Sequence, residues 1–151
     1  LFHEGIPTHY LLQSDDLPGI PNWLGGMVLP FFTWFLLARI HKRIDGPEMA
    51  DTERLQTVVL RFLIAMTIAI AISVLFTFEI DMIEYIMLVI FVLAFIFPLY
   101  KSEYLLGWVI GSSFTFGAII PMGFGSLLAL VFFIFYKIPR VIINYIKSKR
   151  N

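Results

Sequence analysis

Five long apolar segments dominate the pattern of hydrophobic and polar positions along this chain, and short polar stretches separate them. An α-helix needs about 20 apolar residues to cross the hydrocarbon core of a bilayer, and each segment is close to that length. Backbone groups in lipid must be satisfied within the segment, which favours helices over an open sheet. The pattern predicts an all-α, polytopic transmembrane helix bundle with spans at 23–40, 57–78, 82–100, 104–121 and 126–143.

Composition supports the membrane prediction. The chain has 151 residues, of which 59% are hydrophobic and 15% are charged, whereas soluble domains contain about 25% charged residues. A chain of this length has too little interior to hide so much apolar surface from water. The absence of cysteine excludes disulfides, thiolate metal sites and Cys-ligated iron–sulfur clusters.

Charge indicates the orientation. If all five segments span, the loop 41–56 and the carboxyl terminus lie on the same side of the membrane. Ten of the eleven Lys and Arg residues lie on or beside that side, and the charged residues on the other side are all acids. The positive-inside rule then places the amino terminus outside and the carboxyl terminus in the cytoplasm. We expect an outer amphipathic segment at 1–22, a transmembrane bundle at 23–143 and a basic cytoplasmic tail at 144–151, in a multi-pass protein of a bacterial-type plasma membrane.

Proline and glycine predict where the last two segments change direction. The stretch 122–125, "MGFG", is expected to form the outer turn between them, with Pro121 interrupting the helix before it. Pro139 is expected to kink the tail out of the last span. The tail then forms either an amphipathic helix on the anionic inner leaflet or a plain stop-transfer flank.

Three carboxylates, Glu79, Asp81 and Glu84, stand between the second and third segments with no Lys or Arg nearby. They form either the hydrated tip of a hairpin or an acidic outer mouth that attracts cations. Glu84 is the strongest candidate for a function, because it lies three residues into an apolar run and intramembrane acids are often functional.

The fourth segment contains small and hydroxyl-bearing residues. Gly107 and Gly111 are spaced for close contact with another helix. Ser112, Ser113 and Thr115 form the densest uncharged polar group within any segment. They either bond back to the carbonyls of their own helix or line a path for a solute.

Arg61 lies four residues into the second apolar segment. A central arginine is costly in a bilayer, so three interpretations remain open. Its side chain snorkels to the cytoplasmic interface, contacts an anion inside the bundle, or forms a structural ion pair.

The outer segment holds five residues of metal-ligating types. Their spacing is not that of two histidines one turn apart on a helix, and an interfacial lid is the alternative to a metal site. No other cofactor is indicated. The residues are His3, Glu4, His9, Asp15 and Asp16.

The leading functional hypothesis is a small transporter or channel-like protein for a small solute or ion. Its path would be lined by Glu84, Ser112, Ser113 and Thr115, with Arg61 at the inner exit. The chain contains no nucleophile-elbow, phosphate-loop or dinucleotide motif. Orientation already explains its basic residues, so nucleic acid is not indicated as a partner.

Two other hypotheses come from different classes. One is a membrane-embedded enzyme with the outward His/Asp/Glu site, and the other is a non-catalytic membrane subunit or assembly factor. The expected partners are membrane lipids and either other membrane subunits or further copies of the chain. A hydrated cavity reaching Ser112 would favour transport, and a dry interior would favour a structural partner.

Overall fold

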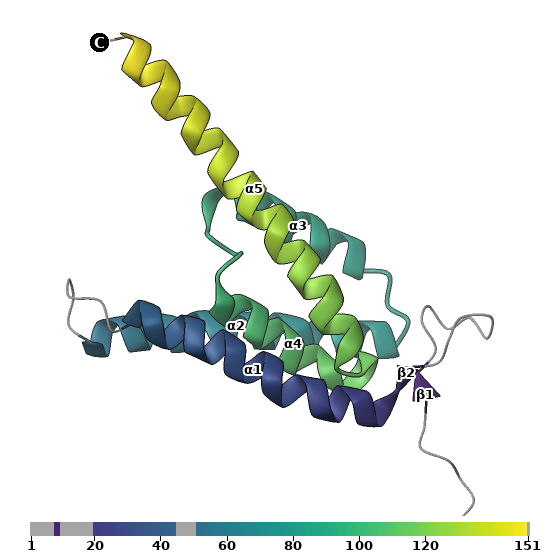
Figure 1. Ribbon diagram of the computed structural model, residues 1–151. Helices are drawn as coiled ribbons and strands as arrows, with labels where there is room; N and C mark the ends of the chain where they lie inside the picture. Colours follow the sequence, from purple (N-terminus) through teal and green to yellow (C-terminus); the bar gives the residue numbers. More distant parts are fainter. Residues whose placement is uncertain (1–7, 10–19, 45–50, 151) are drawn as a thin grey trace, which may run out of the picture.

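The computed structural model describes residues 8–9, 20–44 and 51–150. Two short strands, β1 (Thr8–His9) and β2 (Ile20–Pro21), pair in antiparallel fashion before the helices begin. The prediction of a helical fold is confirmed for the described residues (Figure 1). The helices are α1 (Asn22–Ile44), α2 (Asp51–Thr77), α3 (Ile83–Ile96), α4 (Ser102–Phe116) and α5 (Ile119–Arg150).

Three of the described helices are long and apolar enough to cross a membrane. They are Leu24–Ile44 of α1, Thr52–Thr77 of α2 and Ile119–Lys149 of α5, with 21, 26 and 31 residues. Their length and composition are consistent with an integral membrane protein. Helices α3 and α4 have 14 and 15 residues, which is shorter than the about 20 that a full crossing requires. That all five helices span, and that the amino terminus lies outside, remain predictions.

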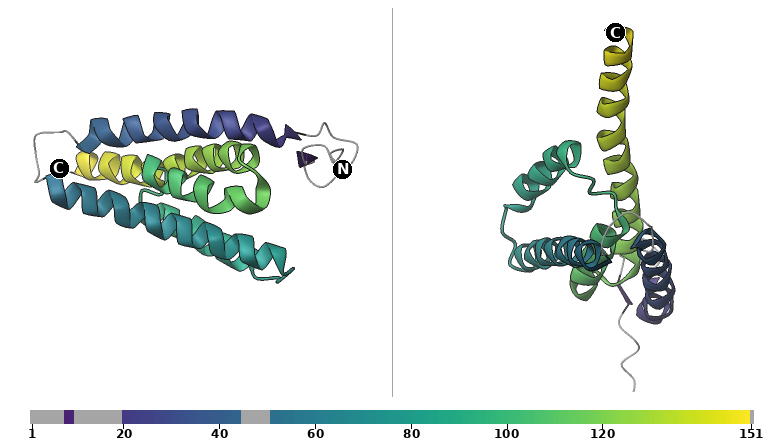
Figure 2. Two further views of the ribbon diagram at one scale, coloured as in Figure 1. Left: turned by 90° about the horizontal axis from the view of Figure 1, so that it is seen from below. Right: turned by 90° about the vertical axis from the view of Figure 1, so that its left-hand side faces the viewer.

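The helices form two groups. Helix α4 packs against α2 and α1, and these three lie side by side, while α5 packs against α4 and α3 and crosses the first group steeply (Figure 1). The carboxyl-terminal part of α5 extends away from the other helices in the right-hand view of Figure 2. Helix α4 therefore joins the two groups.

Two glycines set the closest helix contact, between α4 and α2. A Cβ atom on Gly107 would lie 2.4 Å from the carbonyl oxygen of Phe62, and one on Gly111 would lie 2.7 Å from that of Met66. Such distances are too short for any side chain. The prediction that these glycines allow close helix contact is confirmed.

The chain turns earlier than predicted between α4 and α5. The stretch 122–125 is helical, and the turn lies at residues 117–118, where Gly117 has a φ of 70°. Glycine adopts this left-handed conformation without strain. Pro121 lies in the first turn of α5, where its missing N–H is not needed by the helix, so the predicted interruption at Pro121 was wrong.

The predicted kink at Pro139 does not end the last helix. Helix α5 continues from Ile119 to Arg150 with Pro139 inside it, so the helical part of the predicted tail is an extension of this helix (Figure 1). Helix α3, in contrast, ends before Pro98. Phe97 is extended, with ψ of 145°, because a residue that precedes proline disfavours the helical conformation.

Arg140 on α5 caps the carboxyl end of α3. Its Nη2 donates to the carbonyl oxygen of Ile96 at 3.2 Å and its Nη1 to that of Phe95 at 3.4 Å. Nη1 also donates to the Tyr136 carbonyl at 2.8 Å, and the guanidinium lies 3.4 Å from the Tyr136 ring centroid. The last carbonyls of a helix lack intrahelical partners and carry partial negative charge, so a cation there stabilises α3.

Replacing Arg140 with alanine is expected to lower the free energy of unfolding by about 1–2 kcal/mol, because the α3 carbonyls lose a charged donor. Thermal unfolding in detergent, followed by tryptophan fluorescence, measures the change. Lys147→Ala is the matched control, since Lys147 is an exposed cation on the same helix. Equal losses in the two variants would contradict the capping role.

Candidate functional site

Glu103, in the first turn of α4, is fully buried, with 0% of its surface exposed. Its Oε2 accepts a hydrogen bond from Nη2 of Arg43 at 2.6 Å, and its Oε1 accepts one from Nη1 of Arg61 at 3.2 Å. Arg43 belongs to α1 and Arg61 to α2. One carboxylate therefore ties three helices together at one end of the molecule.

The direction of α2 and α4 explains why Glu103 meets Arg61. A Cβ on Gly107 would lie 3.0 Å from the Cβ of Ala65, and one on Gly111 would lie 2.8 Å from that of Ala69. Each pair is separated by the same number of positions as Glu103 and Arg61. The two helices therefore run parallel, and the glycine contact brings the two charged side chains to the same level.

The two ion pairs offset the penalty of burying Glu103. An unpaired buried carboxylate costs several kcal/mol, and charge-assisted hydrogen bonds to guanidinium groups are among the strongest that proteins form. The side chains of Arg43 and Arg61 remain 40% and 26% exposed. A structural ion pair was one of the three interpretations of Arg61, and it is the arrangement observed.

Lys101 adds a third cation beside these groups, in the connection between α3 and α4. Partial burial lowers the pKa of its amine below the ordinary value, and the positive charges of Arg61 and Arg43 lower it further, while Glu103 acts in the opposite direction. Lys101 makes no ion pair with the described residues. We call Arg43, Arg61, Lys101 and Glu103 the Glu103 cluster.

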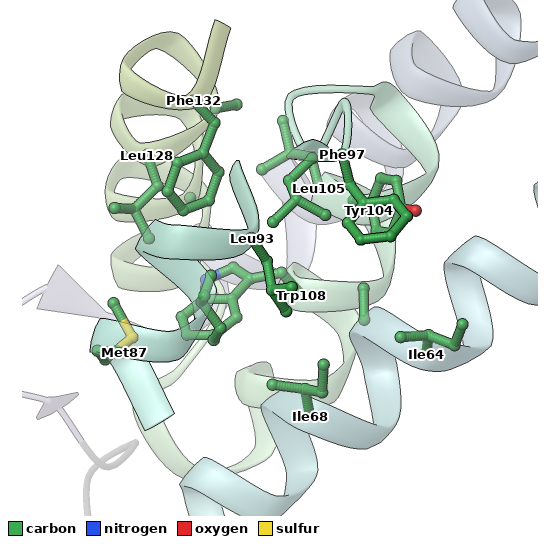
Figure 3. Close-up of a pocket in the computed structure, with 15 residues that line it drawn as sticks. Ile64, Ile68, Met87, Leu93, Phe97, Tyr104, Leu105, Trp108, Leu128 and Phe132 are labelled. Atoms are coloured by element: carbon green, nitrogen blue, oxygen red, sulfur yellow. The ribbon is translucent and has the colours of Figure 1, made fainter. Parts of the chain in front are cut away.

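An apolar cavity of about 260 Å³ lies between α2, α3, α4 and α5 (Figure 3). Aliphatic and aromatic side chains from all four helices form most of its wall. Tyr104 and Trp108 of α4 are its residues with polar side-chain atoms. The wall includes Ile64 and Ile68 of α2, Met87 and Leu93 of α3, and Leu128 and Phe132 of α5.

Tyr104 and Trp108 bring the cavity wall its two polar side-chain atoms, an oxygen and a nitrogen. The Tyr104 ring lines the cavity with its oxygen pointing away from Trp108 (Figure 3), and Arg61 interacts with the Tyr104 side chain. Trp108 Nε1 is a buried donor that finds no acceptor among the described residues. The cavity thus adjoins the Glu103 cluster through Tyr104.

The serines of the predicted path bond to their own helix. Ser112 Oγ donates to the carbonyl oxygen of Trp108 at 2.6 Å, and Ser113 Oγ donates to that of Val109. Ser112 is 1% exposed and is not among the residues that line the apolar cavity. Thr115 lies apart from it, in a groove of about 500 Å³ between α2 and α4.

The predicted acidic mouth lies on the surface. Glu79 and Asp81 are exposed in the connection between α2 and α3, and Glu79 has a φ of 52°. Glu84 is exposed in the first turn of α3 and does not line the apolar cavity or the groove at Thr115. The roles assigned to these acids remain predictions.

The proposed outer metal set cannot be assembled from the described part of the chain. His3, Glu4, Asp15 and Asp16 lie outside the described residues, and His9 is placed only through the pairing of β1 with β2. Within residues 20–44 and 51–150, no three His, Asp or Glu residues form a group that could hold a metal ion. The metal site, and the enzyme hypothesis based on it, remain predictions.

Sequence reasoning missed Glu103, which lies in the short stretch between the predicted spans at 82–100 and 104–121. One signal could have identified it. Arg61 lies inside an apolar segment and requires an anion, and Glu103 precedes the small residue Gly107 by the same interval that separates Arg61 from Ala65. A parallel pairing through these small residues places the carboxylate opposite the guanidinium.

No protein-family model, curated protein or solved structure matches this chain.

Proposed function

We propose that this membrane protein is a small transporter whose ligand enters the cavity between α2, α3, α4 and α5 from the bilayer. The observation that carries the proposal is the apolar cavity beside the Glu103 cluster. Its volume, about 260 Å³, lies just below the about 300–1,000 Å³ typical of small-molecule pockets. Apolar walls with a few polar groups at one side suit a hydrophobic or amphiphilic ligand.

The arrangement of hydroxyl groups supports a lipid-accessible route over a water-filled one. An ion or polar solute needs oxygen or nitrogen ligands to replace its hydration shell. Ser112 and Ser113 already donate to carbonyl oxygens of α4, and Ser112 is buried. We therefore place the ligand in the apolar cavity and not beside these serines.

A non-catalytic membrane subunit is the second candidate. The close contact between α2 and α4 favours it, because Gly107 and Gly111 meet the backbone of α2 and leave no room for a solute there. Native mass spectrometry distinguishes the two candidates. A complex with another membrane protein supports the subunit, and a stable monomer opposes it.

Filling the cavity is expected to abolish transport. Ala129 of α5 lines the cavity, so Ala129→Phe places a ring where the ligand would lie. In reconstituted vesicles, we expect the wild type to accelerate the transbilayer movement of a fluorescent phospholipid. Ala129→Phe should slow this movement at least about tenfold, since overpacking leaves no room for the ligand.

Ala71→Phe is the control for this experiment, because Ala71 is exposed on α2 away from the cavity. It should transport like the wild type. Thermal unfolding of both variants shows whether they remain folded. No acceleration by the wild type would refute lipid transport, and an active, folded Ala129→Phe protein would exclude this cavity as the route.

A further inference from the structure

The Glu103 cluster carries more positive than negative charge. The two oxygens of Glu103 each accept a hydrogen bond from one arginine, Arg43 or Arg61, and Lys101 is near enough for the charges of all three to act on its pKa. Lys101 is left without an ion-pair partner among the described residues. Counting the side chains that the structure describes, the cluster therefore has excess positive charge that an anion can offset.

This excess charge lies at the edge of the apolar cavity. Lys101 stands between Leu99 and Tyr104 in the chain, and both of these residues line the cavity. Arg61 interacts with Tyr104 and belongs to the helix that supplies Ile64 to the same wall. Lys101 and Arg61 do not line the cavity themselves, but they adjoin residues that do, as a ligand with one charged end and one apolar end requires.

We propose that the cavity binds an anionic phospholipid, with an acyl chain between α2, α3, α4 and α5 and the phosphate at Lys101 and Arg61. The inference rests on the cavity of the proposed function and adds the chemical class of its ligand. Phosphate oxygens are preferred partners of arginine and lysine, and basic pockets between membrane helices bind anionic headgroups.

Trp108 adds an independent feature to this site. Its indole ring lines the cavity, and its buried Nε1 has no acceptor among the described residues. Buried donors are nearly always paired in proteins. The nitrogen lies against Gly125 of α5, so the ester carbonyl of a glycerophospholipid can accept from it only if the indole ring turns toward the cavity.

Trp108 also provides the signal for a binding experiment. Replacing Trp23 and Trp34 with phenylalanine leaves Trp108 as the one tryptophan of the chain. The protein is reconstituted in neutral phosphatidylcholine that contains a small fraction of lipid brominated on its acyl chains. Brominated phosphatidylglycerol should quench Trp108 at least about fivefold more effectively than brominated phosphatidylcholine at the same mole fraction.

Two variants test the headgroup contact. Lys101→Gln should reduce the preference for phosphatidylglycerol about fivefold, as expected for the loss of one cation beside an anionic headgroup. Lys147→Gln, which removes an exposed cation from the end of α5, should retain the preference. Neither change removes a partner of Glu103, so both proteins should fold.

Three results would overturn the inference: equal quenching by the two brominated lipids in the wild type, an unchanged preference in Lys101→Gln, or loss of the preference when millimolar inorganic phosphate is added. The last result would assign the site to a free anion. If the protein prefers the anionic lipid but does not accelerate transbilayer movement, the proposed transport is refuted and the phospholipid site stands. If it accelerates the movement without preferring the anionic lipid, transport stands and the anionic-lipid site is refuted.

Discussion

Replacing Glu103 with glutamine is expected to lower the free energy of unfolding by about 3 kcal/mol, near the lower end of the about 3–5 kcal/mol lost when a buried ion pair loses one partner. The lower figure applies because Arg43 and Arg61 remain partly exposed, with side-chain exposures of 40% and 26%. The variant leaves two guanidinium groups and Lys101 without a neutralising carboxylate. Thermal and denaturant unfolding in detergent measure the loss.

Glu53→Gln is the matched control for Glu103→Gln. Glu53 is exposed near the start of α2, so losing its charge should change the free energy of unfolding by less than about 0.5 kcal/mol. If Glu103→Gln were as stable as this control, the carboxylate would not hold α1, α2 and α4 together.

Replacing Gly107 with alanine is expected to lower the free energy of unfolding by at least about 2 kcal/mol, although alanine favours helix formation. The added Cβ would lie 2.4 Å from the Phe62 carbonyl oxygen and 2.9 Å from the Met66 backbone nitrogen. Because both atoms are backbone, α4 must move away from α2, and the separation also weakens the Glu103–Arg61 ion pair.

The same substitution at Gly123 should change the free energy of unfolding in the opposite direction. Gly123 lies in α5, and a Cβ there would meet nothing within 4 Å. Gly123→Ala should therefore raise the free energy of unfolding by up to about 1 kcal/mol. Thermal unfolding of the two variants under one set of conditions provides the comparison, and a stabilised Gly107→Ala protein would contradict the close packing of α2 and α4.

Glu103→Gln and Gly107→Ala both test the contact between α4 and α2. The glycine face lets α4 approach α2, and this approach brings Glu103 within reach of Arg61. Arg43 of α1 completes the ion pairs. Tyr104 follows directly and lines the apolar cavity, so the proposed ligand site adjoins the same first turn of α4 that carries the ion pairs.

Helix content and the close contact of α4 were predictable because both depend on local pattern. Apolar length predicts a helix in lipid, and the spacing of Gly107 and Gly111 predicts a close neighbour. The neighbour itself was not predictable. Tertiary packing determines that α4 lies parallel to α2, and Glu103 and Arg61 lie 42 positions apart in the chain.

The turn at Gly117 is a second feature that the sequence pattern did not predict correctly. Two neighbouring signals, Gly117 and the stretch 122–125, compete within a few residues. Pro121 and the glycines that follow it are tolerated inside α5, since proline fits a first helical turn and Gly125 packs closely on Leu105 and Trp108. Sequence pattern alone does not show this packing, so the turn was placed too late.

The candidate site was predicted only in part, for the same reason. Arg61 was singled out because a cation in an apolar segment is conspicuous. Glu103 and the cavity wall were not, because a carboxylate near a predicted loop resembles a solvated one, and an apolar wall resembles a lipid-facing surface. The role of Glu103 depends on how α4 packs on α1 and α2, and the cavity depends on how α5 packs on α3 and α4. Periodicity determines neither.

A density map of the full chain in nanodiscs containing phosphatidylglycerol tests the central claim most directly. We expect Glu103 between Arg43 and Arg61, and elongated density that runs past Trp108 into the apolar cavity. That density should end in a phosphate within about 4 Å of Lys101 Nζ, the range of an ion pair. A cavity filled by protein side chains, or a solvent-exposed Glu103 separated from Arg61, would contradict it.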